Sequence, residues 1–269
     1  MTTAPTLDET SRRFAGARLR RTSGLVLGWI FFIGLWAFTS SVILNQFTLP
    51  GPVKVGKEIW EIAKTGAFID DFQASISKTF MGFGIAVLIG VPVGYLMGRS
   101  RYWKHFFHDG VVGAGSVPGI VYALMALVIF GIGFLGPVLA VGLISMPFIA
   151  LGVAEGLEGV DSDLLRMSTA YGRTERQTFQ DIMVPSILPF IFAGVRLAFA
   201  IAWKVEALTE VFGSSNGVGF QIRFAFNAFS ITRVMAWTLM FIVLLLGIER
   251  LLAVLERRLF RWRTWEQTT

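Results

Sequence analysis

The chain has no cysteine and only two histidines among its 269 residues. The absence of cysteine excludes disulfide bonds, thiolate metal sites and a cysteine nucleophile. Charged residues are also scarce, at 16%, where a soluble domain has roughly a quarter. Hydrophobic residues make up 54% of the chain, and its mean hydropathy is +0.64. One soluble core cannot bury this much apolar surface, so we expect lipid to cover part of it.

Motifs for nucleotide binding and hydrolysis are missing as well. No G-x-x-x-x-G-K-[ST] phosphate loop, H-E-x-x-H zinc motif or G-x-S-x-G nucleophile elbow occurs. A G-x-G-x-x-G match begins at Gly131, but it lies between two apolar segments and follows no strand, so we interpret it as accidental. His105, His108 and Asp109 have the spacing to touch a metal, yet the aromatic residues around them favour a belt at the membrane interface. We therefore expect the chain not to be an enzyme and to bind no cofactor or metal.

Long charge-free runs mark the membrane-spanning segments. Runs of 32, 20 and 45 residues follow Arg21, Lys78 and Asp109. A bilayer span needs about 20 mostly apolar residues, so the first two runs hold one helix each, and the third holds two helices separated by a glycine-rich turn. Two further spans follow, the first of which carries charges. We predict an all-α integral membrane protein with six spans, at 24–44, 76–98, 112–130, 137–154, 187–212 and 234–255.

The distribution of Lys and Arg predicts the orientation of these spans. With the N-terminus inside, the inner segments hold 16 of the 24 basic residues and the outer segments, Lys78 included, hold 6. This excess predicts that both termini are cytoplasmic. The net charge of +6 is then explained by basic residues that set the topology and contact lipid headgroups. We therefore expect no nucleic-acid partner. The predicted domains are a cytoplasmic arm at 1–22, a six-helix transmembrane domain at 23–263 and a tail at 264–269.

Two local patterns predict packing. Residues 50–75 lie outside and fit a short amphipathic surface helix whose apolar positions include Val53, Ile59 and Ile62. Glycines recur every four residues in the second span, at Gly90, Gly94 and Gly98, and they predict a face that another helix approaches closely.

The inner segment 155–186 is longer than a simple connector needs to be. Asp161 or the serine after it can cap a helix, and 163–171 holds good helix formers before Gly172. A second helical stretch, 174–183, is expected to end at the next proline. This helix–glycine–helix pattern indicates a rigid element offered to a cytoplasmic partner, and a solvated loop is the alternative.

The sequence of this segment resembles a family signature. The segment contains Arg166-Met167-Ser168-Thr169-Ala170-Tyr171-Gly172, followed by Ile182 and Pro185. Its glycine, isoleucine and proline all match the pattern E-A-A-x-x-x-G-(nine residues)-I-x-L-P, which is typical of ABC-importer permeases. The first three positions and the leucine, here Val184, depart from it. Further similarity over 49–263, closest to the nitrate/sulfonate/taurine/bicarbonate branch, is carried by Leu49-Pro50-Gly51-Pro52, Phe130-Gly131-Ile132-Gly133, Arg196-Leu197, Ala202-Trp203, Glu210, Ser215-x-Gly217-x-Gly219-Phe220 and Leu255-Glu256-Arg257-Arg258.

The resemblance implies a type I ABC-importer permease of the bacterial plasma (inner) membrane. Such a subunit pairs with a second copy of itself, sits on two cytoplasmic ATPase subunits that bind ATP and magnesium, and receives substrate from an extracytoplasmic binding protein. It works by alternating access and forms the path for a small substrate, here expected to be anionic or polar and organic. A stand-alone secondary transporter or channel is the alternative, and co-purification with an ATPase separates the two.

Two groups of residues are candidate sites. The expected ATPase-coupling loop contains Ser168, Thr169, Ala170, Tyr171, Gly172, Arg173, Thr174, Ile182 and Pro185. The fifth span, expected at the centre of a homodimer, supplies the expected substrate pathway, Trp203, Lys204, Glu206 and Glu210. A charge at the centre of a span costs about 2.5–3.5 kcal/mol, so these charged side chains must face protein or water. Lys204 in the path favours an anion, and an internal ion pair of Lys204 with Glu206 or Glu210 is the alternative.

Overall fold

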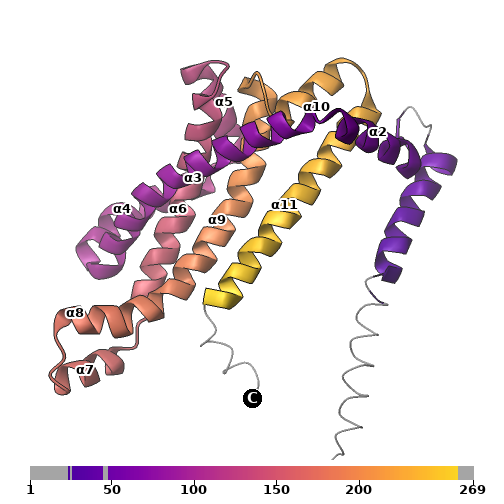
Figure 1. Ribbon diagram of the computed structural model, residues 1–269. Coiled ribbons are helices and arrows are strands. Elements are labelled where there is room, and N and C mark those ends of the chain that lie inside the picture. The colour runs from indigo at the N-terminus through magenta and orange to yellow at the C-terminus, as the bar shows by residue number, and fades with distance from the viewer. Residues whose placement is uncertain (1–23, 25, 45–47, 260–269) are drawn as a thin grey trace, which may run out of the picture.

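A computed structural model describes residue 24 and residues 26–44 and 48–259. Helices are the regular elements of these ranges, and no strand occurs in them (Figure 1). After an apolar helix over 26–43, which ends in the π-helical η1 (Thr39–Ile43), the elements are α2 (Pro52–Thr65), α3 (Phe68–Arg99), α4 (Arg101–Ser116), α5 (Gly119–Phe130), α6 (Leu135–Glu158), α7 (Ser162–Ala170), α8 (Glu175–Thr178), the π-helical η2 (Phe179–Met183), α9 (Val184–Gly213), α10 (Val218–Asn227) and α11 (Ile231–Leu259).

Five of the described helical segments are long and apolar enough to cross a membrane, and α4 with α5 makes a sixth if this bent pair is one span. The predicted third span, a straight helix over 112–130, is wrong, because α4 and α5 meet at an angle of 92°. The bend lies at Pro118, which has no N–H to donate and disfavours the α conformation of the residue before it. Val117 accordingly has an extended ψ of 127°.

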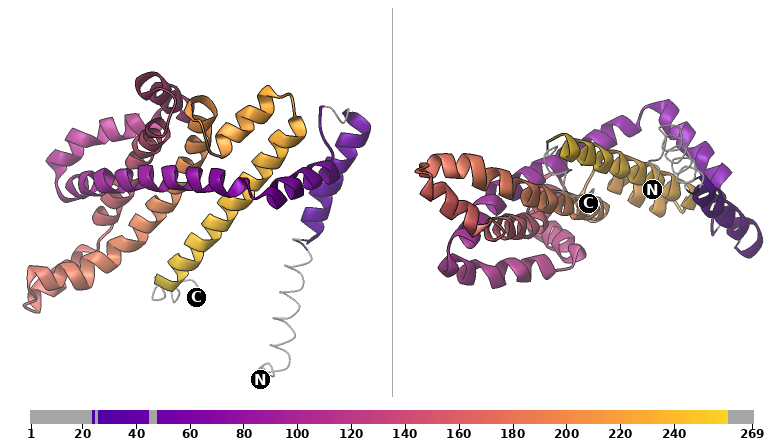
Figure 2. Two further views of the ribbon diagram at one scale, coloured as in Figure 1. Left: turned by 45° about the horizontal axis from the view of Figure 1, so that its top comes forward. Right: turned by 90° about the horizontal axis from the view of Figure 1, so that it is seen from below.

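The spans run side by side, with short helices lying across both ends of the bundle. Figures 1 and 2 show α2 and α10 at one end and α7 with α8 at the other. The start of the first helix and the end of α11 lie at the same end as α7 and α8 (Figure 1). The prediction that this end is cytoplasmic stays a prediction, and the arm at 1–22 and the tail at 264–269 lie outside the described residues.

The helices α3, α6 and α9 form the centre of the bundle. The predicted glycine face is confirmed, and its partner is α6 of the same chain. A Cβ atom at Gly90 would lie 2.9 Å from the Met146 carbonyl oxygen, and one at Gly98 would lie 2.6 Å from the Leu157 Cβ. Such distances are too short for a side chain, so only glycine permits this approach.

The predicted amphipathic helix is confirmed as α2. It buries Val55 and Ile62 against α9, α10 and α11, whereas Val53, expected on the apolar face, is exposed. The helix ends at Gly66, whose φ of 67° closes it in the left-handed conformation. The break before α3 lets α2 lie across the end of the bundle.

The predicted end of the helix at Pro185 is wrong. The chain stays helical from Glu175 to Gly213, over 39 residues, through α8, η2 and α9. Pro185 lies in the first turn of α9, a position that proline tolerates, and the wider π-helical turn of η2 comes directly before it. The element at α8 and the long span α9 are therefore one continuous helical rod, which bends between α8 and α9 (Figure 1).

Candidate functional site

The helices α7 and α8 project from the bundle as a helix–turn–helix element (Figure 2). Asp161 caps α7, since its Oδ1 accepts a hydrogen bond from the Asp163 N–H at 2.8 Å. The chain then reverses at Gly172, which has a φ of 70°. No heavy atom lies within 4 Å of where its Cβ would be. Within this chain the glycine is therefore needed for its positive φ and not for close packing, because the space beside it is open.

Polar contacts hold this element in one shape. The Thr174 side chain and Gln177 form a reciprocal capping box at the start of α8. The Ser168 and Thr178 hydroxyls are 2.6 Å apart and join α7 to the end of α8. Arg173 and Asp181 form an ion pair beside them. The departure from the family pattern at position 168 thus supplies a buried hydroxyl that fixes the two helices.

The outer surface of the element exposes a few apolar side chains among many polar and charged ones. Tyr171 is 80% exposed at its tip, and Leu164 and Met167 of α7 are exposed beside it. Three of the predicted coupling residues are at least partly covered: Ser168 is buried, and Ile182 and Pro185 are half-buried where the element joins the bundle. The remaining six form the exposed tip: Thr169, Ala170, Tyr171, Gly172, Arg173 and Thr174. An element that is held in one shape and exposes a tyrosine at its tip is suited to insertion into a partner.

The four predicted pathway residues lie on two different faces of α9. Trp203 is buried in the core, stacked on Phe241 at a ring distance of 4.9 Å. Glu206 and Glu210 are also fully buried, whereas Lys204 is exposed. Lys204 forms no ion pair in the described part of the chain, and Glu210 is paired with a different lysine. Lys204 is thus the one member of the four that the single chain presents on its surface.

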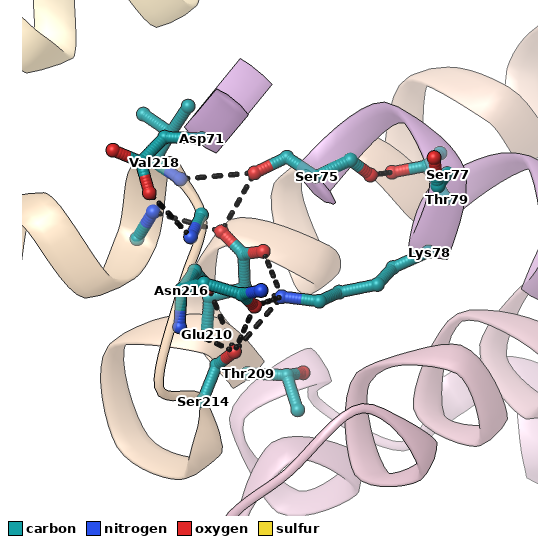
Figure 3. Close-up of polar contacts among 12 residues, drawn as sticks. Asp71, Ser75, Ser77, Lys78, Thr79, Thr209, Glu210, Ser214, Asn216 and Val218 are labelled. Carbon is teal, nitrogen blue, oxygen red and sulfur yellow. Dashed lines mark hydrogen bonds and ion pairs between the residues drawn. The ribbon is translucent and has the colours of Figure 1, made fainter. Parts of the chain in front are cut away.

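The partner of Glu210 is Lys78 of α3, at 2.7 Å, and both side chains are 0% exposed (Figure 3). The other carboxylate oxygen of Glu210 accepts from the Ser75 hydroxyl at 2.8 Å and from the Gly219 N–H at 2.9 Å. The Lys78 ammonium donates three further hydrogen bonds to the segment after α9, to Ser214 Oγ at 2.8 Å, Asn216 O at 2.9 Å and Asn216 Oδ1 at 2.8 Å. This buried pair is satisfied at every donor and both acceptor oxygens.

Asp71, also on α3, extends the network to α10. Its carboxylate accepts from the Gly217 N–H at 2.9 Å and from the Gln221 side chain at 2.7 Å. Gly217 has a φ of 105°, and a Cβ there would collide with the Glu210 carboxylate. The glycine is therefore required twice, for its conformation and for the space that the carboxylate fills. We call Asp71, Ser75, Lys78, Glu210, Ser214 and Asn216 the polar clamp, because together they fasten α3, α9 and α10.

The sequence analysis missed the polar clamp and wrongly counted Lys78 among the outer loop cations. A signal was present, since Asp71, Ser75 and Lys78 follow each other at i, i+4 and i+7 on one face of a helix. Glu210 at membrane depth also required a cation as partner. The distance of 132 residues between the two partners hid the connection.

Glu206 differs from its neighbour. Both of its carboxylate oxygens are buried, and neither meets hydrogen-bond geometry with any described residue. The indole N–H of Trp203, one helical turn away, is unpartnered in the same way. A buried carboxyl that lacks a hydrogen bond disfavours the folded state, although Glu210 and Lys78 lie close enough to interact with its charge.

Comparison with known families identifies the chain. The family model described as "Binding-protein-dependent transport system inner membrane component" matches residues 86–261, well over half of the sequence. The chain belongs to this family of ABC-importer permeases. The matched range contains the α7–α8 element and all of α9, whereas the α3 residues of the polar clamp, Asp71, Ser75 and Lys78, precede it.

Relatives of this permease cover nearly its whole length. A probable ABC transporter permease protein of Brucella abortus (strain 2308) is 26% identical over 90% of this chain and 98% of its own. The putative aliphatic sulfonates transport permease protein SsuC of Bacillus subtilis (strain 168) is 26% identical over 89% and 87%. The taurine transport system permease protein TauC of Escherichia coli (strain K12) is 25% identical over 84% of each chain.

Solved structures confirm the fold. An inward-facing structure of the MetNI methionine ABC transporter has a TM-score of 0.62 at 20% identity, over 74% of the permease and 97% of its own chain. An amino acid ABC transporter solved with histidines has a TM-score of 0.62 at 21% identity, over 74% and 96%. The permease thus has the fold of an ABC-importer membrane subunit, as the sequence predicts.

Proposed function

We propose that two copies of this permease form the translocation path of an importer for a small anionic organic compound. An extracytoplasmic binding protein delivers the compound at the end of the bundle that carries α2 and α10. Two cytoplasmic ATPase subunits, which bind ATP and magnesium, dock at the opposite end. The permease itself supplies no nucleotide site, in keeping with the absence of a phosphate loop from its sequence. The observation that supports the proposal is the projecting α7–α8 element, which polar contacts hold in one shape and which exposes Tyr171 at its tip.

The connection of this element to the spans explains how ATPase movement reaches the path. The rod from Glu175 to Gly213 is continuous, so a displacement of α8 is passed along α9 without an intervening loop. The polar clamp fastens the far end of α9 to α3 and α10. ATP binding that draws the two docked elements together would then move α3, α9 and α10 as one body and change which end of the path is open.

The chemistry of Lys204 supports an anionic substrate. Lys204 is exposed on α9 within a span whose neighbouring exposed residues, such as Leu197 and Phe212, are apolar. A cation in such surroundings must face water or a counter-ion, because lipid does not solvate it. Relatives are named for aliphatic sulfonates, for taurine and for nitrate import, the last from Synechococcus elongatus at 23% identity. Each of these compounds carries an oxyanion that a lysine can bind.

The docking step is tested at Gly172. We expect Gly172→Asp to insert into the membrane but to lose ATP-driven uptake and to lose its ATPase partner on purification. Gly66→Asp is the matched control for ATPase co-purification, because Gly66 also has a positive φ with nothing within 4 Å of its Cβ position but lies at the opposite end of the bundle. Full uptake by the Gly172→Asp complex would refute docking at this element. Purification without any ATPase, even for the unaltered chain, would favour a stand-alone transporter or channel.

The substrate class is tested at Lys204. In proteoliposomes that contain the assembled complex and its binding protein, we expect Lys204→Ala to cut uptake of a sulfonate, whereas Lys204→Arg retains most of it. ATPase co-purification should be unchanged in both variants. Equal uptake by the alanine variant and the unaltered chain would remove Lys204 from the path. A purified complex with one copy of this chain beside a different permease would refute the homodimer.

A further inference from the structure

An apolar pocket of about 350 Å³ lies between the ends of α3, α6 and α9 that face the α7–α8 element. Val91 and Tyr95 of α3, Val153 of α6 and Leu188 of α9 are among the residues that line it, with Phe179 of η2. Its surface is wholly apolar. Because Leu188 and Phe179 are both exposed in the chain, the pocket opens on the surface of the bundle. Such a pocket in a membrane span is suited to a hydrocarbon chain.

A single cation stands beside this pocket. Arg99, the last residue of α3, donates from Nη1 to the Tyr95 hydroxyl at 2.9 Å, so a residue of the pocket wall holds the guanidinium. Arg99 is exposed and has no carboxylate partner among the described residues. Among the described residues toward this end, Lys104 pairs with Glu158, Arg173 with Asp181 and Arg196 with Glu256, whereas Arg101 and Arg176, like Arg99, form no ion pair. The remaining donors of Arg99 are therefore available to an external anion.

We propose that this pocket binds an anionic phospholipid, with an acyl chain against the apolar wall and the phosphate on Arg99. A guanidinium binds phosphate oxygens through two parallel hydrogen bonds. The end of a membrane-spanning helix is also the depth at which a headgroup meets its hydrocarbon chain, and basic pockets between spans recognise anionic headgroups. The site requires only that the chain spans a membrane, so it stands apart from the proposed substrate and dimer.

The position of the pocket gives the lipid a structural role. Phe179 belongs to η2, the turn that joins α8 to α9. A lipid chain in the pocket would contact this turn together with α3 and α6. It would thus fill the space beneath the root of the projecting element and support its attachment to the bundle.

Native mass spectrometry of the purified full chain tests the headgroup. The probes are phosphatidylglycerol, which is anionic, and phosphatidylcholine, which is zwitterionic. We expect a preference for phosphatidylglycerol that Arg99→Gln lowers by about fivefold, the effect of one arginine at an anionic lipid surface. Arg101→Gln is the matched control, since Arg101 is exposed two residues further along. An unchanged preference in Arg99→Gln, or an equal loss in Arg101→Gln, would overturn the proposal.

A second set of variants tests the apolar wall. Leu188→Trp fills the pocket, so we expect it to lower retention of both lipids without changing their ratio. Unchanged retention in this variant would place the lipid elsewhere. Because the native chain has no cysteine, Leu188→Cys also reports on a competing occupant: a disulfide-linked dimer in membranes would assign the pocket to an interface between copies and overturn lipid binding.

Discussion

The polar clamp makes a strong prediction about stability, because its two charges are fully buried. Replacing Glu210 by leucine removes the direct ion-pair partner of the Lys78 ammonium, although three oxygens of Ser214 and Asn216 still accept from it. Replacing Lys78 by methionine leaves the Glu210 carboxylate with only the Ser75 hydroxyl and the Gly219 N–H. Removing one partner of a buried pair costs about 3–5 kcal/mol. We expect each single variant to lose stability in this range.

The double variant separates the charge from the packing. Replacing a buried ion pair by apolar residues of similar volume is often neutral or stabilising. Lys78→Met with Glu210→Leu should therefore be no less stable than either single variant, although the Ser75, Ser214 and Asn216 groups each lose a partner. The coupling between the two substitutions is then favourable and at least about 3 kcal/mol, the upper end of the usual range for residues in direct contact.

Denaturant midpoints of the detergent-solubilised chain provide the measurement, with uptake in proteoliposomes as a second readout. The pair of Lys104 and Glu158 is the matched control, because its atoms also lie 2.7 Å apart but the side chains are 40% and 42% exposed. An exposed pair contributes at most about 1 kcal/mol. Losses that simply add in the Lys78 and Glu210 double variant, or single losses no larger than those of the control, would refute a buried, mutually dependent pair.

Three further predictions concern Glu206, Gly217 and Ser168, the first two tested by thermal denaturation and the third by hydrogen exchange. Glu206→Gln should leave the melting temperature unchanged or raise it, whereas Glu210→Gln should lower it, because only Glu210 has partners to lose; equal losses would show that Glu206 has a hidden partner. Gly217→Ala should destabilise well beyond the roughly 1–2 kcal/mol of a positive φ alone, since its Cβ meets the Glu210 carboxylate. Gly66→Ala, at a φ of 67° with open space around it, should cost no more than that amount, and equal costs at both sites would argue against the collision. Ser168→Ala should loosen the α7–α8 element without unfolding the spans, which hydrogen exchange of residues 162–178 measures against an unchanged exchange of α6.

The long apolar helices, the helix–glycine–helix element and the glycine face of α3 could be predicted because each depends on local sequence. Charge-free runs report burial in lipid directly, and Gly172 and Asp161 act on the backbone beside them. The 92° bend also had a local cause in Pro118. It was missed because counting charges sets the limits of an apolar run but says nothing about a bend inside it. The end assigned at Pro185 failed for the opposite reason, since a proline in a first helical turn does not stop a helix.

Which residues of α9 are buried and which are exposed could be predicted only in part. The i, i+2 spacing correctly separated Lys204 from Glu206, because those positions point to different faces of one helix. Which face is buried depends on α3 and α11, and their packing is set by contacts between residues far apart in the chain. The sequence therefore did not reveal that Glu210 belongs to a structural clamp, or that Trp203 is stacked in the core.

The two ends of the permease are joined by the rod from Glu175 to Gly213. At 1.5 Å per residue, 39 helical residues extend about 58 Å, more than the thickness of a bilayer with its headgroups. At one end the rod carries the exposed tip, and at the other it is fastened to α3 and α10 by hydrogen bonds and a buried ion pair. Lys204 lies between them, on the face that the clamp leaves exposed. In the proposed mechanism, movement at α8 reaches Lys204 and the clamp along α9 without an intervening loop. Substrate binding and ATPase docking would then act on the same helix.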